Sequence, residues 1–158
     1  MATYNRTVTG GGTVGHPSNA AVPYVVTSPV WDTADGGTGG DVVQLIDVPA
    51  DTMIVAGCLE VLEARGNGQI TVDVGFTGGD VDCFIDGSVV AAGFTPFLEA
   101  AVGASGANAR MLTSTDTIDA LILDGGSSGE SALRFRIHVC MVDVSVNPVE
   151  SATVSTGT

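Results

Sequence analysis

Apolar and polar residues alternate over several short segments of this chain. Residues 131–144 read SALRFRIHVCMVDV, and one face of this segment would hold Leu133, Phe135, Ile137, Val139 and Met141. Residues 69–76 (QITVDVGF) alternate in the same way. A period of two places successive side chains on opposite faces of a strand. The pattern therefore predicts half-buried antiparallel strands.

Glycine-rich breaks separate these segments and set the predicted element boundaries. Asp86-Gly87 is a dipeptide that favours a two-residue hairpin turn between two of the strands. One short helix is predicted at 95–104, with Thr95 as the N-cap and Pro96 at the first helical position. The predicted strands are 22–28, 41–48, 52–63, 69–76, 81–86, 88–94, 109–114, 117–124 and 131–144.

Many short strands and few helices predict an all-β fold. We expect an antiparallel β-sandwich, jelly-roll-like, with at most one short helix. The sandwich domain would cover residues 21–144, after an irregular N-terminal arm (1–20) and before an extended C-terminal tail (145–158). The two polar ends allow two interpretations, because such segments either fray or become ordered on a neighbouring subunit.

Composition adds a strong acidic charge to this picture. The 158 residues include 18 acidic and 5 basic side chains, for a net charge of −13, and every basic one is an arginine. Nucleic acids and anionic membranes are bound through Lys and Arg, so we predict neither as a partner. No apolar run reaches the roughly 18 residues that span a bilayer. The first residues also lack the basic and apolar regions of a secretory signal.

Three glycine-rich stretches match ligand-binding or catalytic motifs, but each lacks the context that its chemistry needs. Residues 36–44 (GGTGGDVVQ) match a calcium-binding β-helix nonapeptide, which works in tandem copies, and this chain has a single copy. Residues 10–15 (GGGTVG) lack the strand and helix of a dinucleotide site. Residues 125–129 (GGSSG) lack the helix and residue order of a serine hydrolase. We therefore predict no catalytic residue, no cofactor and no enzymatic activity.

Three carboxylates lie close together in the sequence, at Asp80, Asp82 and Asp86. On a strand they would share one face and repel one another unless a cation joined them. Their spacing is not that of the 12-residue calcium loop. Two interpretations stay open: solvated carboxylates, or a weak divalent-cation site with calcium as the candidate metal.

A positive stripe lies on the last predicted strand, at Arg134, Arg136 and His138. These side chains alternate with apolar ones and so share the polar face of that strand. They could pair with acidic strands of the same sheet or form an interface with an acidic neighbour, and the sequence supports both equally. Catalysis by His138 would need a positioned partner, which the sequence does not identify.

The cysteines, Cys58, Cys83 and Cys140, fit neither a zinc pattern nor a disulfide framework. Each lies in an apolar stretch. This predicts buried thiols that behave as small hydrophobic side chains, in a protein made in a reducing cytosol.

Five segments between residues 40 and 145 carry a resemblance, namely VVQLIDVPADT (42–52), TVDVGF (71–76), CFIDG (83–87), TIDALIL (117–123) and MVDVS (141–145). Through them the chain resembles a type of small β-rich protein encoded among the structural genes of tailed bacteriophages. The resemblance implies a capsid decoration (cement) protein, made in the host cytoplasm and located on the capsid exterior of the virion. Such a protein would bind the major capsid protein as a homotrimer and stabilise the shell by bridging capsomers.

A second class of function stays open, that of a virion fibre or tail module that recognises host surface carbohydrate, with or without calcium. Sugar sites use exposed aromatic side chains, whose apolar faces stack on the ligand. This chain has one Trp, two Tyr and five Phe. The phenylalanines lie mostly in predicted strands or in the predicted helix, which disfavours this alternative.

Overall fold

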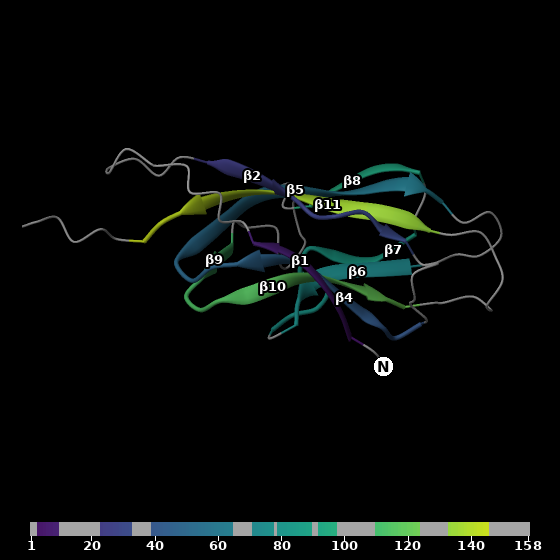
Figure 1. Cartoon of the computed structure of the whole chain (residues 1–158), viewed down its shortest axis with the longest axis horizontal. Coiled ribbons are helices and arrows are strands. Elements are labelled where there is room, and N and C mark those ends of the chain that lie inside the picture. The colour runs from purple at the N-terminus through teal and green to yellow at the C-terminus, as the bar shows by residue number, and fades with distance from the viewer. Residues whose placement is uncertain are drawn as a thin grey trace, which may run out of the picture.

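The computed structural model of this chain describes residues 3–9, 23–32, 39–64, 71–77, 79–89, 92–97, 110–123 and 133–145. The helices and strands assigned within these residues are all β-strands, with no helix among them. The strands form two stacked sheets (Figure 1). The described residues include no helix with the length and apolar character needed to cross a membrane.

The two sheets differ in size. The five-stranded sheet contains, in spatial order, β1 (Thr3–Thr9), β4 (Val42–Val48), β10 (Asp116–Ile122), β6 (Thr71–Phe76) and β7 (Ile85–Val89). The six-stranded sheet contains, in order, β2 (Tyr24–Thr27), β11 (Arg134–Asp143), β5 (Thr52–Glu63) and β8 (Gly93–Phe97), while β3 (Trp31–Asp32) pairs with β11 and β9 (Arg110–Leu112) pairs with β5. The β1–β4 pair is parallel and all other pairs are antiparallel.

The strand order is that of a jelly roll. Without β1, β3 and β9, eight strands remain, and their chain order runs 1-8-3-6 across one sheet and 2-7-4-5 across the other. This is the double Greek-key arrangement of jelly-roll sandwiches. The predicted all-β, jelly-roll-like sandwich is therefore confirmed, and β1 adds a parallel strand at one edge.

Inward-facing side chains of both sheets form one apolar core. Trp31 and Phe135 are its largest members, exposed by 1% and 0%, and burial of each such side chain stabilises the fold by roughly 1.5–3 kcal/mol. Phe84 packs against Phe76 of β6 and Phe97 of β8, with both pairs of ring centroids 5.0 Å apart. These three rings join the two sheets. The other largest fully buried members are Leu45, Ile46, Ile54, Leu59, Ile118, Ile122, Leu133, Ile137, Met141 and Val43.

The predicted strands at 22–28, 41–48, 52–63, 69–76, 109–114, 117–124 and 131–144 each overlap an observed strand. The strand bounds and the hairpin turn predicted between 81 and 94 are wrong, because the observed strands there are β7 and β8. Residues 81–84 form turns, and the Asp86-Gly87 dipeptide lies inside β7 rather than in a hairpin turn. Gly87 has a φ of +60°, and its N–H donates to Oδ1 of Asp73 at 2.6 Å. The dipeptide thus forms a bulge opposite β6, where the register shifts between Val72 and Val74.

The helix predicted at 95–104 is wrong at its start, because Thr95 and Pro96 belong to β8 and pair with Leu59 and Cys58 of β5. Phe97 supplies the reason, since it is 3% exposed and reaches the core from this strand. Pro96 lacks an N–H and is tolerated because β8 is an edge strand. Residues 98–104 lie outside the described residues.

The irregular N-terminal arm predicted at 1–20 is wrong at residues 3–9, which form β1 beside β4. A parallel partner far along the chain supplies the hydrogen bonds that this polar segment needs, and sequence periodicity does not report such a partner. The rest of the predicted arm and tail, from 10 to 20 and from 146 to 158, lies outside the described residues. So do the glycine motifs at 10–15 and 125–129.

Residues 39–44, the described part of the glycine motif at 36–44, have a structural role. Gly40, with a φ of +89°, donates its N–H to the carbonyl of Ile122 at 2.6 Å. Ile122 in turn donates to the carbonyl of Asp41 at 3.0 Å, and the Asp41 residue is 4% exposed. Gly40 and Asp41 therefore extend the pairing of β4 with β10.

Candidate functional site

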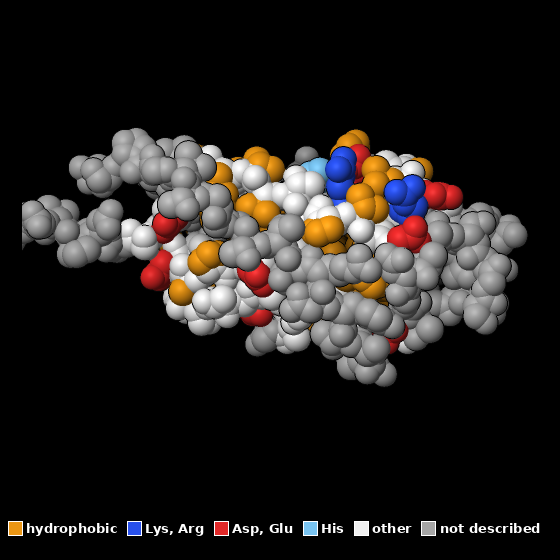
Figure 2. Space-filling view, viewed as in Figure 1, with side chains coloured by type: hydrophobic (Ala, Val, Ile, Leu, Met, Phe, Trp, Pro, Cys, Tyr) orange, Lys and Arg blue, Asp and Glu red, His pale blue; other side chains and the backbone are white. Residues whose placement is uncertain are grey.

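The outer face of the six-stranded sheet carries charged and exposed apolar side chains together (Figure 2). Arginine and histidine side chains gather along the upper edge of that view, with acidic and apolar ones beside them. Strand pairing arranges this face in rows, which run Asp32–Arg134–Glu63, Arg136–Glu60–Phe94, Thr27–His138–Cys58–Pro96, Val25–Cys140–Ala56 and Val142–Met53–Met111. We call these residues the outer face; the first two rows are its charged half and the last three its apolar half.

Glu60 is the centre of the polar contacts on the outer face. Its Oε2 accepts hydrogen bonds from Nε of Arg136 and, at 2.8 Å, from Nε2 of His138. Nδ1 of His138 lies 2.9 Å from Oγ1 of Thr27. Because an ionised carboxylate only accepts, Nε2 carries a proton, and in a neutral imidazole Nδ1 then accepts from the Thr27 hydroxyl. A hydrogen-bonded row therefore crosses β2, β11 and β5.

These contacts stabilise the charged form of Glu60. The hydrogen bond from Arg136 holds the pKa of Glu60 below its ordinary value, and the hydrogen bond from His138 lowers it further. One strand pair away, burial and the negative charge of Glu60 raise the pKa of the Cys58 thiol. Cys58 is therefore a poor nucleophile, since the thiolate is the reactive form of cysteine.

Arg134 forms the second group of ion pairs on the outer face. Its Nε lies 3.7 Å from Oδ2 of Asp32, and its Nη1 lies 4.0 Å from Oε2 of Glu63. The Arg134 side chain is 46% exposed, so water screens both pairs. The first interpretation of the arginine stripe, pairing within its own sheet, is confirmed for Arg134, Arg136 and His138. Contact with a neighbouring molecule stays a prediction.

Thr27, His138 and Glu60 form a hydroxyl–imidazole–carboxylate row, which is the order found in hydrolase triads. Two features separate this row from a catalytic one. Glu60 also accepts from Arg136, which makes the carboxylate a weaker base toward the imidazole. The row also lies across a flat sheet face, where strand pairing occupies the backbone N–H groups that would stabilise an oxyanion. Its evident role is to fix side chains on the surface.

The outer face exposes several large apolar side chains, although Val142 in its last row is only 6% exposed. Val25 is 68% exposed and Met111 is 58% exposed, and Phe94, beside Glu60, is 67% exposed. The three residues share one side of the sheet, with Val25 at the β2 edge and Phe94 and Met111 at the opposite edge, in β8 and β9. Exposed apolar groups on one face of a sheet are typical of an interaction surface. Sequence reasoning located β2 and β9 but did not place Val25 and Met111 together, because only strand pairing shows that they share a face.

The acidic candidates Asp80, Asp82 and Asp86 do not share a strand face. Asp80 and Asp82 lie in the turn before β7, and Asp86 lies inside that strand. The side-chain hydrogen bond with Asp80 raises the pKa of Asp82, so the two carboxyl groups interact by sharing a proton. Among the described residues, no group of three His, Cys, Asp or Glu side chains is arranged to hold a metal ion. The calcium hypothesis therefore has no geometric support here and stays a prediction.

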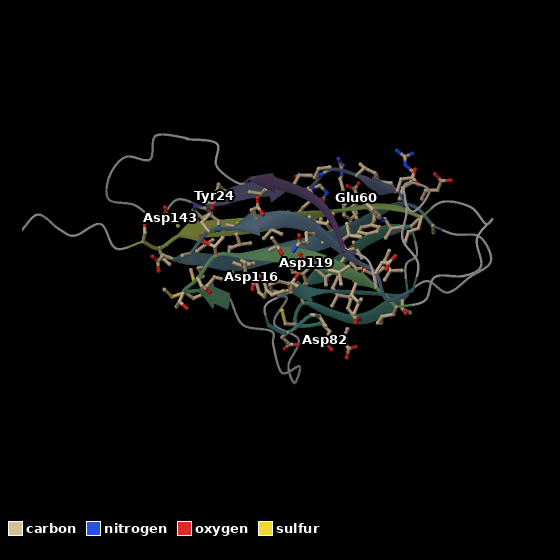
Figure 3. All side chains as sticks on the ribbon, turned by 60° about the horizontal axis from the view of Figure 1, so that its bottom comes forward. Tyr24, Glu60, Asp82, Asp116, Asp119 and Asp143 are labelled. Carbon is tan, nitrogen blue, oxygen red and sulfur yellow. The ribbon has the colours of Figure 1, made fainter. Side chains whose placement is uncertain are left out.

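Asp119 of β10 is a buried carboxyl group that sequence reasoning missed. It is 4% exposed, and neither of its side-chain oxygens has a hydrogen-bond partner in ordinary geometry. Burial raises the pKa of Asp119 to about 7, and the nearby Thr117 side chain and Thr77 backbone offset this only in part. The signal was present in TIDALIL, where an aspartate interrupts an apolar strand. Figure 3 labels Asp119 and Glu60, which lie on different sheets.

The turn before β7 covers this part of the five-stranded sheet. Gly75 is the strand partner of Asp119. A Cβ added at Gly75 would lie 2.3 Å from the carbonyl oxygen of Asp80 and 2.4 Å from the carbonyl carbon of Val81. The turn backbone therefore rests directly on Gly75, next to Asp119, and only glycine allows this approach.

The cysteines are free thiols, and each is half-buried. The prediction of buried core thiols is wrong for Cys58 and Cys140, which lie on the outer face. Cys83 packs against the core from the turn before β7.

No protein-family model and no curated protein matches this chain. Its structure matches chains in three solved capsid structures, at 14–20% sequence identity. This chain shares its fold with phage capsid chains. The phage resemblance inferred from the sequence is thus confirmed at the level of the fold.

The three matches are similar in extent. For the acidic stable capsid of Helicobacter pylori bacteriophage KHP30, the TM-score is 0.58 at 16% identity, over 77% of this chain and 88% of the other. For the capsid asymmetric unit of cyanophage Pam1, it is 0.60 at 14% identity, over 80% and 89%. For the capsid of Ralstonia phage GP4, it is 0.57 at 20% identity, over 81% and 89%.

Proposed function

We propose that this chain is a non-enzymatic structural protein of a phage virion, and more specifically a decoration protein. It would bind the outer capsid surface and stabilise the shell by bridging neighbouring capsid subunits. The observation that carries the proposal is the jelly-roll fold shared with three phage capsid chains over 77–81% of this chain. The phage resemblance of the sequence segments between 40 and 145 supports it independently.

The described surface suits a protein that acts by contact. Its polar side chains are held by one another on a flat sheet face, as Glu60 is by Arg136 and His138. Because these side chains are already held in place, few of them lose conformational freedom when a partner binds. This lowers the entropic cost of association. Many copies bound around a shell would add small contact energies through avidity.

The alternative of a carbohydrate-binding fibre or tail module has less support. Trp31 is 1% exposed and Tyr24 is half-buried, so neither presents a free ring face to a sugar. Phe94 is an exposed ring but lies at the edge of the sheet. Stacking sites for sugars depend on aromatic faces that are open to the ligand.

The proposal is tested by adding the purified chain to shells of its own phage that lack it. Cryo-EM of the mixture is expected to show symmetric density on the outside of the head. The same shells should resist heating better with the chain than without it. Density confined to a tail or fibre would favour the adhesion alternative, and the absence of any binding would contradict the decoration role.

Two finer predictions from the sequence belong to this proposal. The resemblance implies a homotrimer on the shell, and the symmetry of the cryo-EM density on decorated shells tests this. Calcium binding at Asp80, Asp82 and Asp86 is checked by a melting-temperature titration with calcium, in which Asp82→Asn should abolish any rise. Magnesium serves as the control cation, because it prefers a stricter octahedral geometry.

A further inference from the structure

Exposed apolar side chains of this chain concentrate on one sheet. Six large apolar side chains are prominently exposed within the described residues, and Val25, Leu62, Phe94 and Met111 belong to strands of the six-stranded sheet. Val25, Phe94 and Met111 pair with outer-face residues of neighbouring strands. Burying such groups against a partner is favourable in proportion to the apolar area removed from water.

The charged half of the outer face is self-complementary. Along β11 the outward residues are Arg134, Arg136 and His138, and their partners on β5 are Glu63, Glu60 and Cys58. Consider a twofold axis that lies above the outer face, parallel to the strands and midway between β5 and β11. A second copy generated by this axis places its β5 opposite the first copy's β11. Arg136 of each copy then faces Glu60 of the other, and Arg134 faces Glu63.

The same rotation matches the apolar half. It keeps each row opposite itself, so Cys140 of one copy faces Ala56 of the other. Stacked sheets lie about 10 Å apart with strand directions within about 30° of each other, so the central strands stay in register near the axis. Arg136 uses Nε for its own Glu60, and a guanidinium has five donors, so it can reach a second carboxylate as well.

On these grounds we propose that two copies of this chain pack face to face through the outer face, around a twofold axis between β5 and β11. The proposal goes beyond the virion role and concerns the purified protein alone. The partner that this surface fits is therefore a second copy of the chain itself.

Net charge favours this face over the others. The chain carries −13 overall, so most surfaces of two copies repel each other. Every arginine or histidine whose side chain the structure describes lies on the outer face, where Arg134, Arg136 and His138 are matched by Asp32, Glu60 and Glu63. The outer side of the five-stranded sheet carries the half-buried Asp47 instead, and none of the arginine or histidine side chains that the structure describes. Copies can approach through the outer face with the least repulsion.

The size of the face is adequate for such a contact. Four strands at about 4.8 Å spacing and nine residues at about 3.3 Å each give roughly 19 by 30 Å in projection. A standard interface removes about 800 Å² of accessible surface from each partner. A second copy that covers the whole outer face therefore gives a contact near the lower limit for a specific dimer.

Sedimentation equilibrium over a wide concentration range tests the exposed apolar side chains of the outer face. The wild type is expected to dimerise reversibly. Val25→Asp and Phe94→Asp should each raise the dimer dissociation constant by about tenfold or more, as expected for a buried contact residue. Val81→Asp and Leu123→Asp are matched controls, because Val81 and Leu123 are 39% and 44% exposed but lie outside the outer face. They should leave the constant unchanged.

A charge exchange tests the twofold register. Arg136→Glu places two carboxylates side by side, and Glu60→Arg places two guanidinium groups side by side. Each variant alone should self-associate about tenfold more weakly or worse, while an equimolar mixture should form a heterodimer. The chain that carries both substitutions should dimerise like the wild type, which separates the effect on association from any effect on folding.

The outcomes are distinct. Dimerisation that responds to the outer-face variants, spares the controls and is recovered in the mixture supports the proposal. A wild type that stays monomeric at all concentrations overturns it, as does a trimer. A dimer that Val25→Asp, Phe94→Asp and Arg136→Glu leave unchanged also overturns it. None of these results bears on shell binding, which the experiment with phage shells tests separately.

Discussion

Acidic side chains on the two outer sides of the sandwich lie in different environments. On the six-stranded sheet, Glu60 stays partly exposed and accepts hydrogen bonds from Arg136 and His138. On the five-stranded sheet, Asp119 is buried beside the turn before β7 and has no such partner. The first carboxylate is stabilised in its charged form and the second in its neutral form.

The difference comes from what covers each side. In β11 burial alternates almost strictly, because its outward side chains face solvent. In β4, β6 and β10 consecutive residues are buried, because both sides of these strands are covered. A strand with one covered side keeps its alternation, and a strand with two covered sides loses it. An aspartate in the second environment must become neutral or find a partner.

The largest effect is expected from Asp119→Asn. The folded-state pKa of Asp119, raised by burial to about 7, exceeds its ordinary value of 3.8. The contribution of this group to stability is therefore complete below pH 3.8 and is lost as the pH rises to about 7. Asparagine cannot ionise, so at pH 8 the variant should be more stable than the wild type by about 3 kcal/mol, allowing for screening. Urea unfolding at pH 5 and pH 8 measures this.

Asp47→Asn is the matched control for Asp119→Asn. Asp47 is half-buried on the same side of the same sheet, in β4. Its variant should show the pH dependence of the wild type. An Asp119→Asn variant with an unchanged pH profile would mean that Asp119 ionises freely in the folded protein.

Gly75→Ala should destabilise the fold by about 2 kcal/mol, because the new methyl group would overlap the turn backbone at Asp80 and Val81. Gly79→Ala in the same turn is the control, since its nearest contact would be the Cβ of Phe76 at 3.9 Å. If the turn moves away in the Gly75 variant, Asp119 becomes hydrated and its pKa should fall. A combined Gly75→Ala and Asp119→Asn variant would then show non-additive unfolding free energies.

Glu60→Gln is expected to cause a smaller loss with the opposite pH dependence. The hydrogen bond from Arg136 lowers the pKa of Glu60 below its ordinary value of 4.5. Its contribution to stability is present above that value and is lost as the pH falls through the lowered pKa. Melting temperatures should therefore differ between wild type and variant at pH 7 and converge in strong acid. A constant difference at all pH values would assign the effect to packing instead of charge.

Arg134→Ala should have the smallest effect, about 0.5 kcal/mol or less. Its contacts with Asp32 and Glu63 are 3.7 and 4.0 Å long, and the side chain is 46% exposed, which is the setting in which ion pairs contribute little. Thermal unfolding at low and high salt measures this contribution, and any difference should vanish at high salt. A loss above about 2 kcal/mol would show that this pair is effectively buried.

The sequence by itself determined the fold class and most of the strands. Alternation in 131–144 predicted β11, and the strand predicted at 52–63 has the observed bounds of β5. These segments have one side in the core, so the local pattern of side chains already reports their environment. The stripe of Arg134, Arg136 and His138 followed from the same pattern.

Only the tertiary structure decided which residues meet across strands. Glu60 and His138 are 78 residues apart, and their contact depends on the register of β5 with β11. β8 in place of a helix, the bulge at Gly87 and the burial of Asp119 also depend on distant partners: Phe97 in the core, Asp73 of β6 and the turn over Gly75. Local patterns fix which side of a strand faces the core, whereas long-range pairing fixes what covers the other side.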